Sequence, residues 1–368
     1  MRNIITSALV LILTSISHIA FAEVVFAADG ESIVFNPTTG NYLITYYNDF
    51  KQKYKQIIFV PATKINPIIK NKITLDGSGT IHYEHTLVSA GNSQQAIRMY
   101  ILDPISSVKT PLPDIPLNAP PGNIMADMTN VESYFDTPRL WNVSMGYSDG
   151  QMSFRIGWGR SLKTVGLTPG NQASFGFKSR DLPGIIRAEV YGYAPDSQEV
   201  EKEMDEGDEN DADNFDREYI NLAHRKNFVS RNAAVPAIAV PAPFDAAVLL
   251  DRIRAQVDTW PGKQLLDPAF AVQLDRSMVA AAGAFRNNQP KAGREHIESL
   301  RKLLDREHKY LDHDDEDNDD TAEHKAATRL TIDRLAARVL DFDLRYVLKR
   351  IEKEHEHDHD EGDRRKER

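Results

Sequence analysis

Hydrophobic residues recur at every second position, or in short runs, through residues 24–193. This alternation places apolar side chains on one face of a strand, so it predicts β-strands rather than helices. Turn residues at 76–79, 89–92 and 148–150 separate the runs. The strands expected from this pattern cover residues 42–47, 56–60, 80–89, 95–102, 141–147, 152–158, 172–178 and 185–193. About eight short strands without helices between them predict an antiparallel, immunoglobulin-like β-sandwich over residues 23–195.

Two long segments give this sandwich its most distinctive pattern. Residues 79–103 read GTIHYEHTLVSAGNSQQAIRMYILD, and residues 166–185 read GLTPGNQASFGFKSRDLPGI, with two Pro-Gly turns that each lead into a strand. Together with Trp141 and Trp158, these segments resemble the β-sandwich modules of uncharacterised exported bacterial proteins. The resemblance implies a fold and an exported location, and it brings no catalytic residue with it.

Beyond Phe244 the apolar spacing changes to three and four residues, the period of amphipathic helices. Asp267 is expected to cap the second helix, with Pro268 at its first position, and Thr321 to cap the fourth. The residues expected on the buried faces are Leu249, Ile253, Val257, Trp260, Phe270, Leu274, Met278, Ala281, Phe285, Ile297, Leu300, Leu304, Ile332, Leu335, Val339 and Phe342. The sequence therefore predicts an all-α antiparallel helical bundle over residues 244–352, with an acidic insertion at 312–320.

Composition divides the remaining chain into a linker and a tail. Residues 197–214 read SQEVEKEMDEGDENDADN, an acidic run that cannot form a hydrophobic core. A semi-ordered stretch is expected from Phe215 to Phe228, and AAVPAIAVPAPF then follows as a proline-stiffened spacer. We therefore expect a linker at 196–243 and a charged, His-rich tail at 353–368. The sandwich and the helical segment are each expected to fold alone.

The helical segment resembles a known family. Residues 249–304 read LLDRIRAQVDTWPGKQLLDPAFAVQLDRSMVAAAGAFRNNQPKAGREHIESLRKLL. This segment resembles the FIMAH domain, a small helical module at the C-termini of secreted bacterial proteins and enzymes. The matching features are the leucines and the valine of the first helix, the Gly262 turn, the stripe from Leu274 to Ala282, the Asn287-Asn288 turn and the face with Ala292 and Leu300. The family is associated with attachment or interaction rather than catalysis, and the resemblance implies the same here. The acidic run before the fourth helix departs from the family pattern.

The first 22 residues determine the expected location. A basic start, an apolar run from Ile4 to Ile16 and an Ala20-Phe21-Ala22 ending predict a secretory signal peptide at 1–22. No later apolar run reaches about 18 residues, so no membrane span is expected once the signal is removed. The 368 residues contain no cysteine, so packed cores rather than disulfides must stabilise a secreted or periplasmic protein.

An aromatic platform is one candidate binding site. Residues 103–139 form a long, proline-rich stretch, and Tyr134, Phe135 and Trp141 at its end offer aromatic rings for a ligand. The simpler interpretation, which we favour for Trp141 and Trp158, is that these rings belong to the core.

Metal binding is a second candidate. Asp312, Asp314, Glu316 and Glu323 occupy positions 1, 3, 5 and 12 of a calcium loop, although Asp317 replaces the glycine that its turn requires. In the tail, His355, His357 and His359 alternate with acids and suit zinc or another transition metal. We expect at most loosely bound calcium or zinc, and the alternative is that both tracts only solubilise the chain.

The chain shows no nucleophile elbow, zinc-protease helix motif or phosphate-binding glycine loop. His82 and His85 alternate on one strand, so they cannot form a paired site. The net charge of −10 disfavours nucleic acid as a partner. These features predict a secreted, noncatalytic binding or attachment protein whose partner is a surface or extracellular protein or glycan. The alternatives are a periplasmic or extracellular metal-binding protein and an accessory protein of an extracellular hydrolase.

Overall fold

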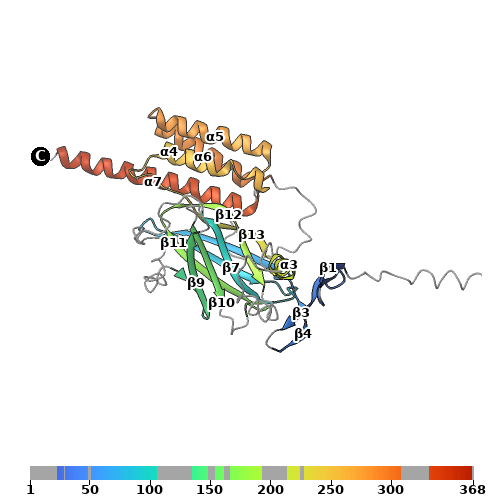
Figure 1. The fold of residues 1–368 in the computed structure, drawn as a ribbon. Helices are drawn as coiled ribbons and strands as arrows, with labels where there is room; N and C mark the ends of the chain where they lie inside the picture. Colours follow the sequence, from blue (N-terminus) through green and yellow to red (C-terminus); the bar gives the residue numbers. More distant parts are fainter. Residues whose placement is uncertain are drawn as a thin grey trace, which may run out of the picture.

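In the computed structural model, the chain forms three antiparallel sheets followed by a layer of helices (Figure 1). The structure describes residues 23–28, 30–48, 51–105, 135–147, 154–160, 166–192, 214–223, 228–307 and 331–366. Within these residues, no helix is both long enough and apolar enough to cross a membrane.

The first sheet stands apart from the other two (Figure 1). It consists of β1 (Glu23–Ala28), β2 (Glu31–Asn36), β3 (Asn41–Asn48) and β4 (Lys53–Phe59), each paired with the next. Helix α3 (Asn214–Ala223) packs Phe215 and Tyr219 onto one face, where they meet Ile33 and Phe59 in a small core of their own. The prediction that residues 23–59 belong to the sandwich was therefore wrong. Short turns keep consecutive strands paired with each other, which leaves these four as a separate meander.

The other two sheets pack against each other around an aromatic core. One has the order β13-β12-β7-β10-β9 and the other β5-β6-β11-β8. Their strands are β5 (Pro67–Leu75), β6 (Ile81–Ser89), β7 (Ile97–Ile105), β8 (Phe135–Asp136), β9 (Trp141–Tyr147), β10 (Phe154–Arg160), β11 (Gln172–Ser179), β12 (Leu182–Gly192) and β13 (Val229–Ile238). Trp158 of one sheet lies 5.4 Å from Phe175 of the other, and both are fully buried. All eight strands expected from the sequence are present, and these two sheets contain six of them.

The expected linker at 196–243 contributes two regular elements, so the spacer interpretation of its second half was wrong. Besides α3, its apolar run forms β13, which pairs antiparallel with β12 from Val229↔Val190 to Ile238↔Leu182. Proline is tolerated there because β13 is an edge strand and Pro236 lies at a register irregularity.

The helical layer consists of α4 (Ala246–Val257), the 3-10 turn η2 (Pro261–Lys263), α5 (Pro268–Arg286), α6 (Pro290–Glu307) and α7 (Arg334–Lys366). Asp267 caps α5 through the Ala269 amide at 2.9 Å, with Pro268 at the first position, as predicted. Helix α7 begins after Asp333, whose carboxylate accepts from the Leu335 amide at 2.8 Å. Thr321, the predicted cap of the fourth helix, lies outside the described residues and 13 positions before α7 begins.

The predicted tail at 353–368 is not a separate segment, because the backbone of α7 stays helical to Lys366. Glu, Lys and Arg have high helix propensity, which allows the helix to continue beyond Ile351, the last of its described side chains that is buried.

One continuous hydrophobic core joins the helical layer to the paired sheets. It includes Trp158 and Phe177 between the sheets, Ile186 on β12, and Leu340 and Leu344 on α7. The expected domain boundary near residue 244 therefore falls inside a shared core.

Candidate functional site

The predicted aromatic platform is not available as a unit. Trp141 is only 5% exposed, and its ring meets Phe175 edge to face at 5.0 Å. Phe135 belongs to the short strand β8, whose backbone pairs with β11, and Tyr134 lies outside the described residues. Trp141 is thus a core residue, the interpretation we favoured from the sequence, and Trp158 is another.

The predicted metal ligands fall largely beyond what the structure describes. Asp312, Asp314, Glu316 and Glu323 lie outside the described residues. For His355, His357 and His359 only the helical backbone of α7 is described. Across the described side chains, no group of three or more His, Asp or Glu residues could hold a metal ion.

Three ionisable groups with raised pKa values lie where the helices meet the sheets. Asp343 of α7 is 1% exposed, and burial raises the pKa of its carboxyl well above the usual value. The Tyr83 hydroxyl donates to the backbone carbonyl of Asp181 at 2.7 Å. Burial, opposed by the charge of Arg252, raises the pKa of the Asp181 carboxyl to about 6.

Such raised pKa values are common at active sites, but they also occur in structural contacts. Asp343 is enclosed in the shared core, so a substrate cannot reach it. Tyr83 is equally buried, and burial together with the charges of Asp343 and Asp181 raises the pKa of its hydroxyl. We therefore regard these groups as a pH-sensitive contact between layers rather than as a catalytic centre.

A second cluster of buried polar residues links β13 to β5 and β6 by hydrogen bonds. The Asn71 side chain accepts from the Ala234 amide at 2.9 Å, and His85 Nε2 donates to the Ala234 carbonyl at 2.8 Å. His85 Nδ1 then accepts from the Tyr100 hydroxyl at 2.7 Å. Burial lowers the pKa of His85 to about 4, so the imidazole is neutral and structural. His82 points away, 3.3 Å from Asp76, which confirms that the two histidines face opposite sides.

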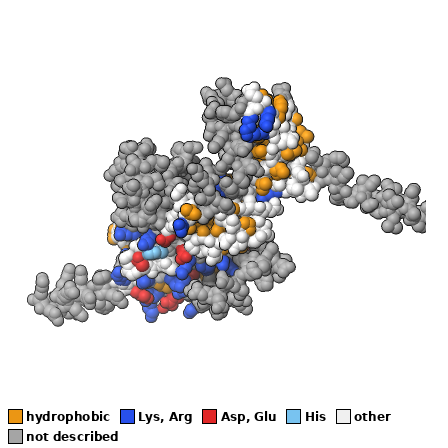
Figure 2. Space-filling view, turned by 90° about the horizontal axis from the view of Figure 1, so that it is seen from below, with side chains coloured by type: hydrophobic (Ala, Val, Ile, Leu, Met, Phe, Trp, Pro, Cys, Tyr) orange, Lys and Arg blue, Asp and Glu red, His pale blue; other side chains and the backbone are white. Residues whose placement is uncertain are grey.

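The clearest surface feature is the outer face of the β1–β4 sheet, the side opposite α3. The register of the strands aligns Val24, Val34, Leu43 and Ile58 in one row across all four strands. Val24 is 61% exposed and Ile58 is 59% exposed. Figure 2 shows hydrophobic side chains gathered on this sheet, in the unit at the upper right. Contiguous exposed apolar surface of this kind commonly marks a binding site.

Two further rows lie beside the aliphatic one on the same outer face. A polar row contains Ser32, Thr45 and Gln56, and a tyrosine row contains Tyr47 and Tyr54, whose rings meet edge to face at 5.2 Å. Gly30, with φ of +89°, lies beneath Tyr54, because a Cβ there would come within 2.5 Å of the Tyr54 hydroxyl. A glycine at this turn therefore lets the Tyr54 ring lie across it.

Sequence reasoning missed this face because its strands β1 and β2 were not predicted. The alternation of Leu43, Thr45 and Tyr47 with Ile44 and Tyr46 was visible, but alternation does not tell which face a helix covers. A comparison of the chain with known protein families and with curated proteins finds no match.

Proposed function

We propose that this chain is an exported, noncatalytic protein that attaches to a component of the cell surface or the extracellular space through the outer face of the β1–β4 sheet. The observation that carries the proposal is the exposed row of Val24, Leu43 and Ile58 on a sheet that stands apart from the rest of the chain (Figures 1 and 2). Interfaces are depleted of charged residues at their centre and enriched in tyrosine, as this face is.

The architecture is consistent with this role. We assign the paired sheets to an immunoglobulin-like sandwich, supported by their antiparallel strands and aromatic core. We assign the helices to an antiparallel bundle that resembles the FIMAH domain, supported by the capped start at Asp267 and the buried stripe from Phe270 to Met278. The signal-like residues 1–22 support secretion or a periplasmic location.

Retention on envelope material tests the attachment. The chain without residues 1–22 should sediment with insoluble bacterial envelope fractions. The double variant Leu43→Asp with Ile58→Asp should lose this retention, because two charges would be buried on contact. The matched control is Val272→Asp with Val279→Asp, two similarly exposed valines on α5. Equal retention of both double variants, or no retention of the unchanged chain, would contradict the proposal.

The continuous helix α7 favours a second candidate function, the binding of a transition metal. His355 and His359 are four residues apart in this helix, a spacing that puts two positions on one face. Zinc titration should show binding that is lost in His355→Ala with His359→Ala and retained in His357→Ala. Binding that needs all three histidines equally would contradict a helical site.

A further inference from the structure

We infer that the outer face of the β1–β4 sheet binds an uncharged polysaccharide chain. This inference rests on the proposed function and specifies its partner. Three properties of the face support it: its charge, its area and the order of its three rows.

The charged residues of these four strands point to the side that faces α3, not to the outer face. Glu23 is opposite Phe35, and Lys53 is opposite the buried Asn48, both on the side that faces α3. Lys55 lies over the Tyr46 ring, 6.0 Å from its centroid, on that same side. Glu31 directly precedes Ser32, which points outward, so the Glu31 side chain points to the α3 side. Of the described strand residues that point outward, none is charged. One cation described beside them, Lys64, lies at the edge of the face and donates its hydrogen bonds to the outward Asn41 and to the Thr39 carbonyl. The strands themselves therefore offer an ionic partner no counter-charge.

The area of the face argues against a second copy of the chain as the partner. Four strands about 4.8 Å apart and about six residues long give a face of roughly 400 Å². Stable protein interfaces bury at least about 1,200 Å² of accessible surface in total, so two faces with this small footprint would make only a small interface. A flat face of this size suits an extended polymer chain that lies across it.

The order of the rows matches the chemistry of a neutral sugar. A sugar ring presents apolar C–H faces and a rim of hydroxyl groups. The aliphatic row and the Tyr47 and Tyr54 rings offer apolar contact, while the polar row between them offers hydrogen bonds. Gln56 Nε2 donates to Thr45 Oγ1 at a long 3.3 Å, which leaves the Gln56 amide free to bond ligand hydroxyls as well.

Affinity electrophoresis with defined polymers tests this assignment. The chain without residues 1–22 should be retarded in gels that contain a neutral polymer, from a panel of hydroxyethylcellulose, dextran and amylose. Anionic alginate should not retard it. Retardation by none of the neutral polymers, or equal retardation by alginate, would overturn the inference.

Two variants separate a sugar from other partners. Tyr47→Ala with Tyr54→Ala should weaken binding by about tenfold through lost ring contacts. Thr45→Val with Gln56→Leu keeps strand propensity and shape but removes the hydrogen bonds, so it should also weaken binding. Stronger binding of that variant to the polymer, or a concentration-dependent dimer in sedimentation velocity, would indicate an apolar partner or a second copy and overturn the inference. Val272→Asp with Val279→Asp is the control that should bind normally, and thermal unfolding of each variant checks folding.

The two proposals fail in different ways. If the unchanged chain is retained by envelope fractions and soluble neutral polymer does not compete, attachment holds and the sugar assignment is wrong. If the chain is not retained but a neutral polymer retards it, the sugar assignment holds and the envelope is not its target.

Discussion

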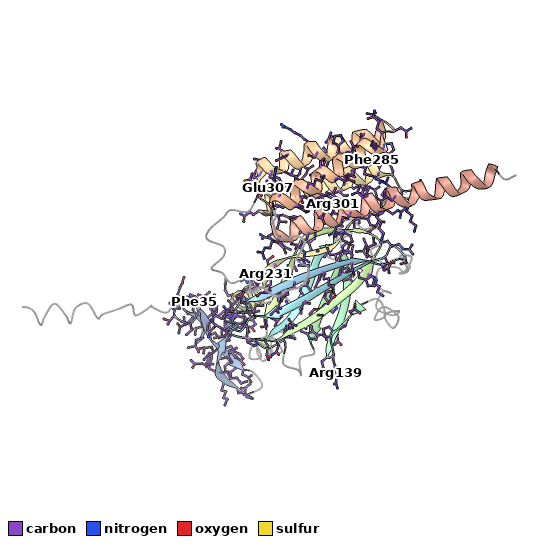
Figure 3. All side chains as sticks on the ribbon, turned by 180° about the vertical axis from the view of Figure 1, so that it is seen from behind. Phe35, Arg139, Arg231, Phe285, Arg301 and Glu307 are labelled. Carbon is purple, nitrogen blue, oxygen red and sulfur yellow. The ribbon has the colours of Figure 1, made fainter. Side chains whose placement is uncertain are left out.

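Arg338 of α7 donates a hydrogen bond from Nη2 to the backbone carbonyl of Asn71 in β5 at 2.8 Å. The two residues are 267 positions apart in the sequence. Because β5 is the edge strand of its sheet, this carbonyl has no strand partner. The arginine thus supplies a hydrogen-bond donor to an unpaired carbonyl at the edge of the sheet and holds the helical layer against that edge. Figure 3 shows this layer, with Arg301 and Phe285, lying along one side of the sheets.

We predict that Arg338→Ala lowers the free energy of unfolding by about 1–3 kcal/mol, because it leaves a largely enclosed carbonyl without a donor. Urea unfolding of the chain without residues 1–22 measures this. Arg276→Ala, at an exposed position of α5, is the matched control and should change little. Equal effects of the two substitutions would show that Arg338 contributes nothing to the docking.

Asp343 should make the protein less stable as the pH rises. In the unfolded chain this carboxyl ionises near pH 4, whereas burial raises its pKa in the folded chain. Above pH 4 the folded state therefore keeps a proton that the unfolded state has lost, so stability falls with increasing pH. Asp181, with its pKa raised to about 6, contributes in the same direction between about pH 4 and 6. Asp343→Asn should flatten this decline and raise the midpoint of thermal unfolding at pH 8.

The neighbouring Asp341 provides the contrast. Its carboxylate accepts from Arg301 at 2.7 Å and pairs with Arg345 at 2.6 Å. Asp341→Asn should therefore destabilise the protein at pH 8, opposite in sign to Asp343→Asn. If both substitutions stabilise or both destabilise at that pH, the assignment of Asp343 as a buried neutral acid is wrong.

His85 should make the protein less stable as the pH falls. Its pKa is about 4 in the folded chain and 6.5 in the unfolded chain, so the unfolded state binds the extra proton between these values. Acidification from pH 6.5 to 4 should cost about 3 kcal/mol of stability through this residue. In His85→Gln the amide can still donate to Ala234, and this acid-dependent loss should disappear. If His85→Gln loses as much stability on acidification as the unchanged chain, the assignment of His85 as a buried neutral imidazole is wrong.

The sequence predicted those parts of the fold that depend on local periodicity. Strands such as β6 and β11 and the stripe from Phe270 to Met278 on α5 were visible because neighbouring residues alone determine which face is apolar. The pairing of β12 with β13 was not visible, because 36 residues separate Gly192 from Val229 and local composition suggested a linker.

The candidate sites were predicted less well for a similar reason. Polar residues such as His85 and Asp343 look like surface positions in a sequence, and only tertiary packing encloses them. The outer face of the β1–β4 sheet became apparent only when α3 was seen to cover the other side, since α3 lies more than 150 residues beyond β4.

Cleavage in the acidic run tests whether β13 and α7 hold the C-terminal part of the chain to the sheets. A single cut between residues 197 and 213 separates the sequence into a fragment with β1–β12 and a fragment with α3, β13 and the helices. If residues 196–243 were only a linker, the two fragments would separate on a sizing column. Because β13 pairs with β12 along its length and α7 shares the core with the sheets, we predict that they co-elute and part only in denaturant. A helical fragment made alone from residue 244 should bind a hydrophobic dye, since the face of α7 that packs against β12 and β13 would be uncovered. Separation of the fragments without denaturant, with no dye binding, would instead support two domains that fold independently.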